Sequence, residues 1–97
     1  MKVLKGVIEE SQAYYRQIEA EILKRLAALP KGSVKKRKLN NKVYYYLQAR
    51  QGRRVIHKYL GKQKPEEILK QLKERKRLAE ELKKVGQSLK KVKKLNQ

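Results

Sequence analysis

The chain has 97 residues, with 28 Lys or Arg, nine Glu, no Asp and no Cys, and its formal net charge is +19. This imbalance argues against an ordinary soluble enzyme and against a surface of balanced ion pairs. It predicts a polyanionic partner, with nucleic acid before an anionic membrane. Apolar residues make up 39% of the chain, so we expect a thin core within one domain, residues 1–97.

The first predicted element is a helix over residues 3–29. Mostly apolar residues recur there at steps of three and four, which places them on one face. That face consists of Leu4, Ile8, Ser11, Tyr15, Ile18, Ile22, Leu26 and Leu29. The segment "LPKGS" ends the helix, because Pro30 disfavours helix in the preceding residue and Gly32 permits a turn.

Residues 34–60 are predicted to form three short strands in an antiparallel β-meander. "NN" at 40–41 suits the tight turn of a hairpin, and "QG" at 51–52 offers a second turn. The segments "KVYYYLQAR" and "RVIHKYL" are rich in β-branched and aromatic residues, whereas "VKKRKL" is the weakest of the three strands.

The last predicted element is a helix over residues 65–95. Pro65 suits the first helical position, and Glu66 and Glu67 suit its positive N-terminal end. A short coiled-coil seam follows, made of Leu78, Leu82, Val85, Leu89 and Val92. The C-terminal turns are basic, with Lys83, Lys84, Lys90, Lys91, Lys93 and Lys94, and we expect them to fray. The predicted fold is therefore α+β, with the meander between two long helices that pack as a helical hairpin.

Alternation of side chains assigns the strand residues to two faces of the sheet if both turns have two-residue loops. The first turn then pairs Leu39 with Lys42, and the second pairs Arg50 with Arg53. One face is mainly apolar and suited to pack on a helix, with Val34, Val43, Tyr45, Leu47, Ala49, Ile56 and Leu60 beside Lys36, Lys38, Arg54 and Lys58. We therefore expect Tyr45 to serve the core. A three-residue loop at either turn would move some of these residues to the other face.

The other face is predicted to be cationic, and it carries Lys35, Arg37, Tyr44, Tyr46, Gln48, Arg50, Arg53, His57 and Tyr59. Lys and Arg neutralise phosphates, Arg and Gln read base edges, and tyrosines bond phosphates or stack on unpaired bases. The predicted contacts are Lys35, Arg37, Arg50, Arg53 and His57, assisted by Tyr44, Tyr46 and Gln48. High β-propensity alone explains "YYY" equally well, but residues 22–65 hold 14 Lys or Arg and no Glu.

The chain lacks the residues that catalytic sites usually contain. There is one His and no Cys or Asp, and no carboxylate lies between Glu21 and Glu66 to hold the metal ions of a nuclease. A tyrosine nucleophile for strand transfer would need a larger supporting shell than one meander provides. We therefore expect that the protein is not an enzyme and that it binds no metal, cofactor or small-molecule substrate.

The sequence also suggests where the protein works. Glu9 comes too early for the apolar region of a signal peptide, and no run approaches the 18 apolar residues of a membrane span. We expect a cytoplasmic protein, and we do not expect a membrane as its partner.

The run "LPKGSVKKRKLNNKVYYYLQARQGRRVIHKYLGK", flanked by helices, resembles a family of small prokaryotic proteins of unknown function. The shared features are the Leu-Pro-x-Gly-Ser opening, the tyrosine-rich strand and the closing Tyr-Leu-Gly-Lys, and the resemblance covers most of residues 5–80. More loosely, "RQGRRVIHKYLG" resembles N-terminal segments of insertion-sequence transposases, and the meander resembles the arm-binding domains of tyrosine recombinases. Those similarities imply DNA binding in a mobile-element setting.

The sequence thus predicts non-enzymatic nucleic-acid binding, with double-stranded DNA preferred over RNA, and it is compatible with a homodimer through the helices. The alternative is a helical protein–protein interaction module, with a positive charge that is incidental or directed to a membrane surface.

Overall fold

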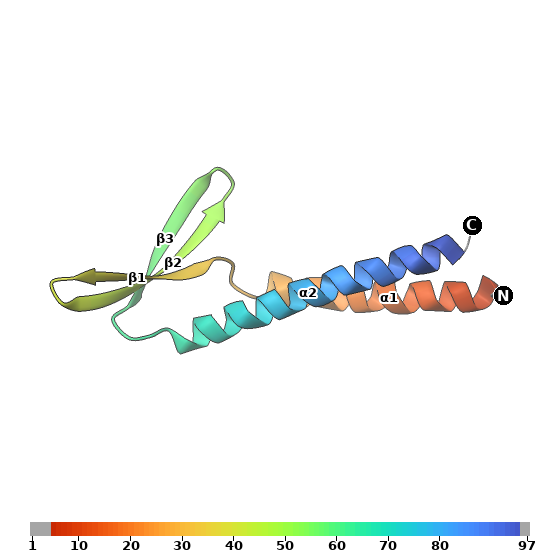
Figure 1. Cartoon of the computed structure of the whole chain (residues 1–97), viewed down its shortest axis with the longest axis horizontal. Coiled ribbons are helices and arrows are strands. Elements are labelled where there is room, and N and C mark those ends of the chain that lie inside the picture. The colour runs from red at the N-terminus through yellow and green to blue at the C-terminus, as the bar shows by residue number, and fades with distance from the viewer. Residues whose placement is uncertain (1–4, 96–97) are drawn as a thin grey trace. The chain divides into compact units, whose positions relative to one another are not determined.

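The computed structural model describes residues 5–95 and confirms the predicted α+β fold, with a β-meander between two long helices (Figure 1). Its elements are α1 (Lys5–Ala27), β1 (Ser33–Leu39), β2 (Lys42–Gln51), β3 (Arg54–Gly61) and α2 (Glu66–Leu95). They form two compact units, of which the sheet unit is Leu29–Arg75. The helical unit holds the described residues up to Ala28 and from Lys76 on, so that α2 belongs to both.

The end of α1 is set by Pro30. The Ala28 N–H donates to the Arg25 carbonyl at 3.2 Å in a last, tighter turn, and Leu29 is not helical because it precedes proline. The helix therefore ends two residues before the predicted position 29. The predicted start at residue 3, and Leu4 with it, lie outside the described residues.

The helix α2 begins immediately after Pro65, whose carbonyl accepts a hydrogen bond from the Leu69 N–H at 3.0 Å. It continues through Gly86 to Leu95, which matches the predicted end. Fraying of the basic last turns concerns motion and stays a prediction. No helix among residues 5–95 has both the length and the apolar character to cross a membrane.

The helical unit holds all the buried side chains found among the described residues: Ile8, Ile22, Leu26 and Leu78. Leu78 is 0% exposed, which an isolated helix cannot achieve, and α1 lies beside the second part of α2 in the opposite direction (Figure 1). Ile18, Leu82 and Leu89 are only half-buried, because a pair of helices encloses a narrow seam.

The sheet has the strand order β1-β2-β3, and its turns have different backbone conformations. Asn40 and Asn41 both have positive φ, 49° and 65°, as a type I′ turn requires, and Leu39 pairs with Lys42 as predicted. In the second turn Gly52 has a φ of 63° and Gln51 pairs with Arg54. The predicted pairing of Arg50 with Arg53 is therefore wrong.

The observed second turn shifts the pairing between β2 and β3 by two residues relative to the prediction. An even shift does not exchange the two faces of the sheet. Glycine at the first loop position favours a type II′ turn through Gly52 and Arg53, which explains why the loop starts one residue later than predicted. Arg53 consequently lies in the turn itself and not on a strand.

A β-bulge interrupts β3 near its end. Tyr46 lies opposite Tyr59, but its neighbour Tyr45 lies opposite Gly61, so Leu60 is an extra residue on β3. The alternation that predicted Leu60 on the apolar face does not hold across this bulge.

Neither face of the sheet contains a buried residue. Tyr45 is half-buried, and Ile56 on the same face is 43% exposed, so the expectation that Tyr45 belongs to a core is wrong. Only the central strand of a three-stranded sheet has neighbours on both sides, which explains why half-burial is concentrated on β2.

Gly32 fixes the start of the sheet. Its φ is 119°, and a Cβ at this position would overlap the backbone carbonyl oxygen of Gln48 on β2. Only glycine allows this approach of two backbones. Arg75 Nη1 donates to the Leu29 carbonyl at 3.3 Å, which joins the two ends of the sheet unit.

Candidate nucleic-acid interface

One face of the sheet carries three tyrosines, and we call it the tyrosine face. The register places Lys35 opposite Tyr46 and Tyr46 opposite Tyr59, and it also pairs Gln48 with His57. The tyrosine face consists of Ser33, Lys35, Arg37, Lys42, Tyr44, Tyr46, Gln48, Arg50, Val55, His57 and Tyr59, with Leu39 at its end. It therefore includes seven of the eight predicted site residues, all except Arg53.

The three tyrosine rings form a contiguous cluster. The Tyr59 ring lies 5.5 Å from that of Tyr46 and 6.3 Å from that of Tyr44, measured between centroids, and both pairs are tilted. These distances are within the range of favourable aromatic pairs. Tyr59 remains 52% exposed, so the cluster presents aromatic surface to solvent.

Two cations lie near the rings of this cluster. The Arg37 guanidinium carbon is 5.8 Å from the centroid of Tyr46, and Lys62 Nζ is 5.9 Å from that of Tyr44. Both distances allow cation–π attraction. Sequence reasoning missed Lys62, because it follows the bulge at Leu60. The glycine in "YLGK" was the available signal for such an irregularity.

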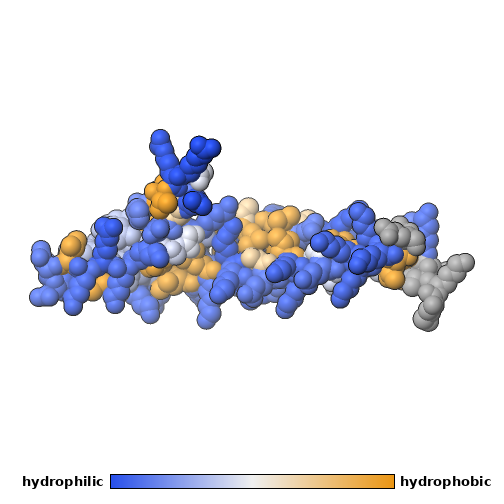
Figure 2. All heavy atoms as spheres, turned by 45° about the horizontal axis from the view of Figure 1, so that its top comes forward, coloured by the Kyte–Doolittle hydropathy of each residue, from blue (hydrophilic) through white to orange (hydrophobic). Residues whose placement is uncertain are grey.

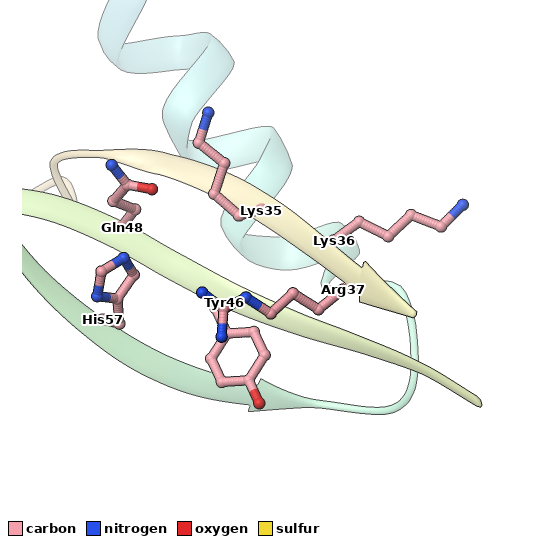
Figure 3. Close-up of a pocket in the computed structure, with 6 residues that line it drawn as sticks. All are labelled: Lys35, Lys36, Arg37, Tyr46, Gln48 and His57. Atoms are coloured by element: carbon pink, nitrogen blue, oxygen red, sulfur yellow. The ribbon is translucent and has the colours of Figure 1, made fainter. Parts of the chain in front are cut away.

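A hollow of about 360 Å³ opens on the tyrosine face beside Tyr46. Its lining is Lys35, Lys36, Arg37, Tyr46, Gln48 and His57, of which all but Lys36 were predicted site residues. Figure 3 shows Gln48 and His57 side by side at one end of the hollow and the Arg37 guanidinium beside Tyr46 at the other. Lys36 points away from this group (Figure 3).

The structure does not bring every predicted residue to the hollow. Tyr44 lies further along the tyrosine face, and Arg53 lies in the turn. Arg50 borders a second, apolar groove with Pro30, Leu47 and Ile56. The predicted set thus separates into a group around the hollow and a peripheral group.

The charge around these residues is of one sign. Residues 33–61 contain nine Lys or Arg and no Glu, so the strands offer no carboxylate to neutralise a cation. Hydrophilic residues cover most of the face that Figure 2 shows, with apolar patches between them, the broadest near the middle of the view. A polyanion is the ligand class for which such a surface is complementary.

A family described as a domain of unknown function, DUF6788, has a sequence pattern that matches residues 11–70. The chain belongs to this family. The match includes most of α1, the whole sheet and the first residues of α2. Searches among curated proteins and among solved structures gave no match.

The DUF6788 region contains the complete tyrosine face, its hollow and Lys62. The basic turns of α2 from Lys83 onward lie outside it. The family description assigns no activity, so the function must be argued from the surface itself.

Proposed function

We propose that this protein binds nucleic acid through the tyrosine face, without catalysis, and that its ligand is double-stranded DNA in preference to RNA. The observation that carries the proposal is the cluster of three tyrosine rings with Arg37 and Lys62 beside it, on a sheet without carboxylates. An aromatic and cationic surface of this composition contacts both bases and phosphates.

Groove dimensions favour DNA over RNA in this proposal. The major groove of B-DNA admits a β-ribbon, where Arg37 and Gln48 have the chemistry to read base edges, whereas the major groove of A-form RNA is too narrow. The resemblance to arm-binding domains of recombinases supports the same docking mode. A mobile-element setting and a cytoplasmic location belong to this proposal as well.

The test is a binding titration against duplex DNA, single-stranded DNA and double-stranded RNA of equal length, and against anionic vesicles. If the face covers about 5 to 8 phosphates, log affinity falls with log salt at a slope of roughly −4.5 to −7. Duplex DNA should bind most tightly. Binding that is insensitive to salt, or confined to vesicles, would overturn the proposal.

A second candidate function, assembly through the helices, has one observation in its favour. Val7, Tyr14 and Leu23 on α1 are 50%, 60% and 50% exposed, and α1 has four Lys or Arg balanced by four Glu. A neutral helix with exposed apolar residues allows two copies to meet without repulsion. Sedimentation at high salt tests this: a homodimer that Val7→Ser dissociates supports it, and a monomer at every concentration refutes it.

A further inference from the structure

The hollow beside Tyr46 has features that phosphate binding alone does not require. Its volume of about 360 Å³ lies at the low end of the ~300 to 1,000 Å³ range of small-ligand pockets. It has an aromatic ring on one side and two side chains with both donor and acceptor capacity, Gln48 and His57, on the other. Phosphate oxygens only accept hydrogen bonds and gain nothing from an aromatic ring.

A nucleobase uses all of these groups. Its flat surface stacks on an aromatic ring, its edge carries donors and acceptors, and its own phosphates carry negative charge. In the hollow, Tyr46 supplies the ring, and Gln48 and His57 supply partners for the edge. Lys35 supplies positive charge, and so does Arg37, whose guanidinium lies beside the Tyr46 ring (Figure 3).

We propose that this hollow takes a single unpaired nucleotide, with its base between Tyr46 and the Gln48–His57 pair and its flanking phosphates against Lys35 and Arg37. The inference rests on the proposed function and narrows its ligand to duplex DNA that contains an unpaired base, such as a bulge. A base within an intact duplex is covered by its neighbours on both sides, so it cannot stack on Tyr46 unless the duplex opens at a cost of a few kcal/mol.

The experiment compares a perfect duplex with a duplex of the same length that carries one bulged nucleotide, in the same buffer. We expect the bulged duplex to bind about 5- to 150-fold more tightly, the equivalent of the ~1 to 3 kcal/mol of one base stacked on an aromatic ring. Tyr46→Leu should abolish this preference, measured as the ratio of the affinities for the two duplexes, whatever it does to the binding of the perfect duplex. Tyr46→Phe, which keeps the ring, should retain the preference.

Tyr44→Leu is the matched control, because Tyr44 lies on the same face and in the same ring cluster but outside the hollow. It should retain the preference for the bulge. If Tyr46→Leu does not fold, Gln48→Ala provides the test, since it removes an edge partner without touching the ring cluster, and it should reduce the preference.

The outcomes separate the two proposals. Equal binding of both duplexes by the unchanged protein, or a preference that survives both Tyr46→Leu and Gln48→Ala, would overturn the unpaired-nucleotide site and leave duplex binding intact. Failure to bind either duplex would overturn the proposed function itself.

Discussion

The helical unit and the sheet unit are stabilised in different ways. Every buried side chain among residues 5–95 belongs to the helices, whereas no residue of the sheet is buried. The sheet depends instead on backbone pairing, two tight turns, a required glycine and contacts between exposed rings. A sheet whose side chains are not needed for a core leaves them free for a ligand. Four predictions test this contrast, from the largest expected effect to the smallest.

Gly32→Ala should have the largest effect and should act on the sheet alone. The strained backbone costs about 1–3 kcal/mol and the overlap with the Gln48 carbonyl about 1–3 kcal/mol more. Amide exchange should show loss of protection in β1 and β2, with helical circular dichroism retained. Gly86→Ala is the control, because a Cβ there meets nothing within 4 Å. It should leave the protein at least as stable.

Leu78→Ala is the corresponding change in the helical unit. Removing a fully buried leucine should cost about 2–5 kcal/mol in the free energy of unfolding. Thermal melting followed at the helical signal measures it. Leu95→Ala, at a site that is 58% exposed, should have little effect. Equal costs at the two leucines would mean that the helices do not pack around Leu78.

Tyr59→Ala should cost roughly 1–3 kcal/mol, since it removes two ring contacts worth about 0.5–1.5 kcal/mol each. The effect should appear in the amide protection of β3 and not in the melting of the helices. Tyr14→Ala is the control, because it makes the same substitution at an exposed tyrosine of α1, in the helical unit. If it destabilises the sheet as much as Tyr59→Ala, the ring cluster contributes no local stability.

The lysines of α2 should matter least for binding. Lys83→Gln together with Lys90→Gln removes two exposed charges from the helical unit, outside the tyrosine face. Both lysines also lie outside the family region, residues 11–70, so affinity for duplex DNA should fall only slightly. A titration in which this pair weakens binding as much as a pair on the tyrosine face would place the interface on α2.

The sequence predicted the elements well because their signals are local. Asn40–Asn41 and Pro30 act through the backbone conformations that these residues allow, and both were identified correctly. The second turn was misplaced because "QGRR" accommodates two loop positions. The strand residues before the bulge at Leu60 were still assigned to the correct faces, since the error was an even number of residues.

What the sequence could not supply depends on contacts distant along the chain. Alternation separates the faces of a sheet, but it does not reveal whether anything covers a face, and Tyr45 was therefore assigned to a core that the sheet lacks. The bulge at Leu60 breaks the alternation that every face assignment assumes, which concealed the position of Lys62 beside Tyr44.

The most direct test of the central claim compares the two faces of the sheet at equal charge. Lys35→Gln with Arg37→Gln alters the tyrosine face, whereas Lys38→Gln with Arg54→Gln alters the opposite face by the same residue types. Each pair lowers the net charge by two, and duplex binding is titrated over a range of salt concentrations. The account predicts that the first pair weakens binding and makes the slope shallower by about 1.8 units, for two lost phosphate contacts, while the second changes little. Equal losses for both pairs, or a greater loss for the second, would contradict it.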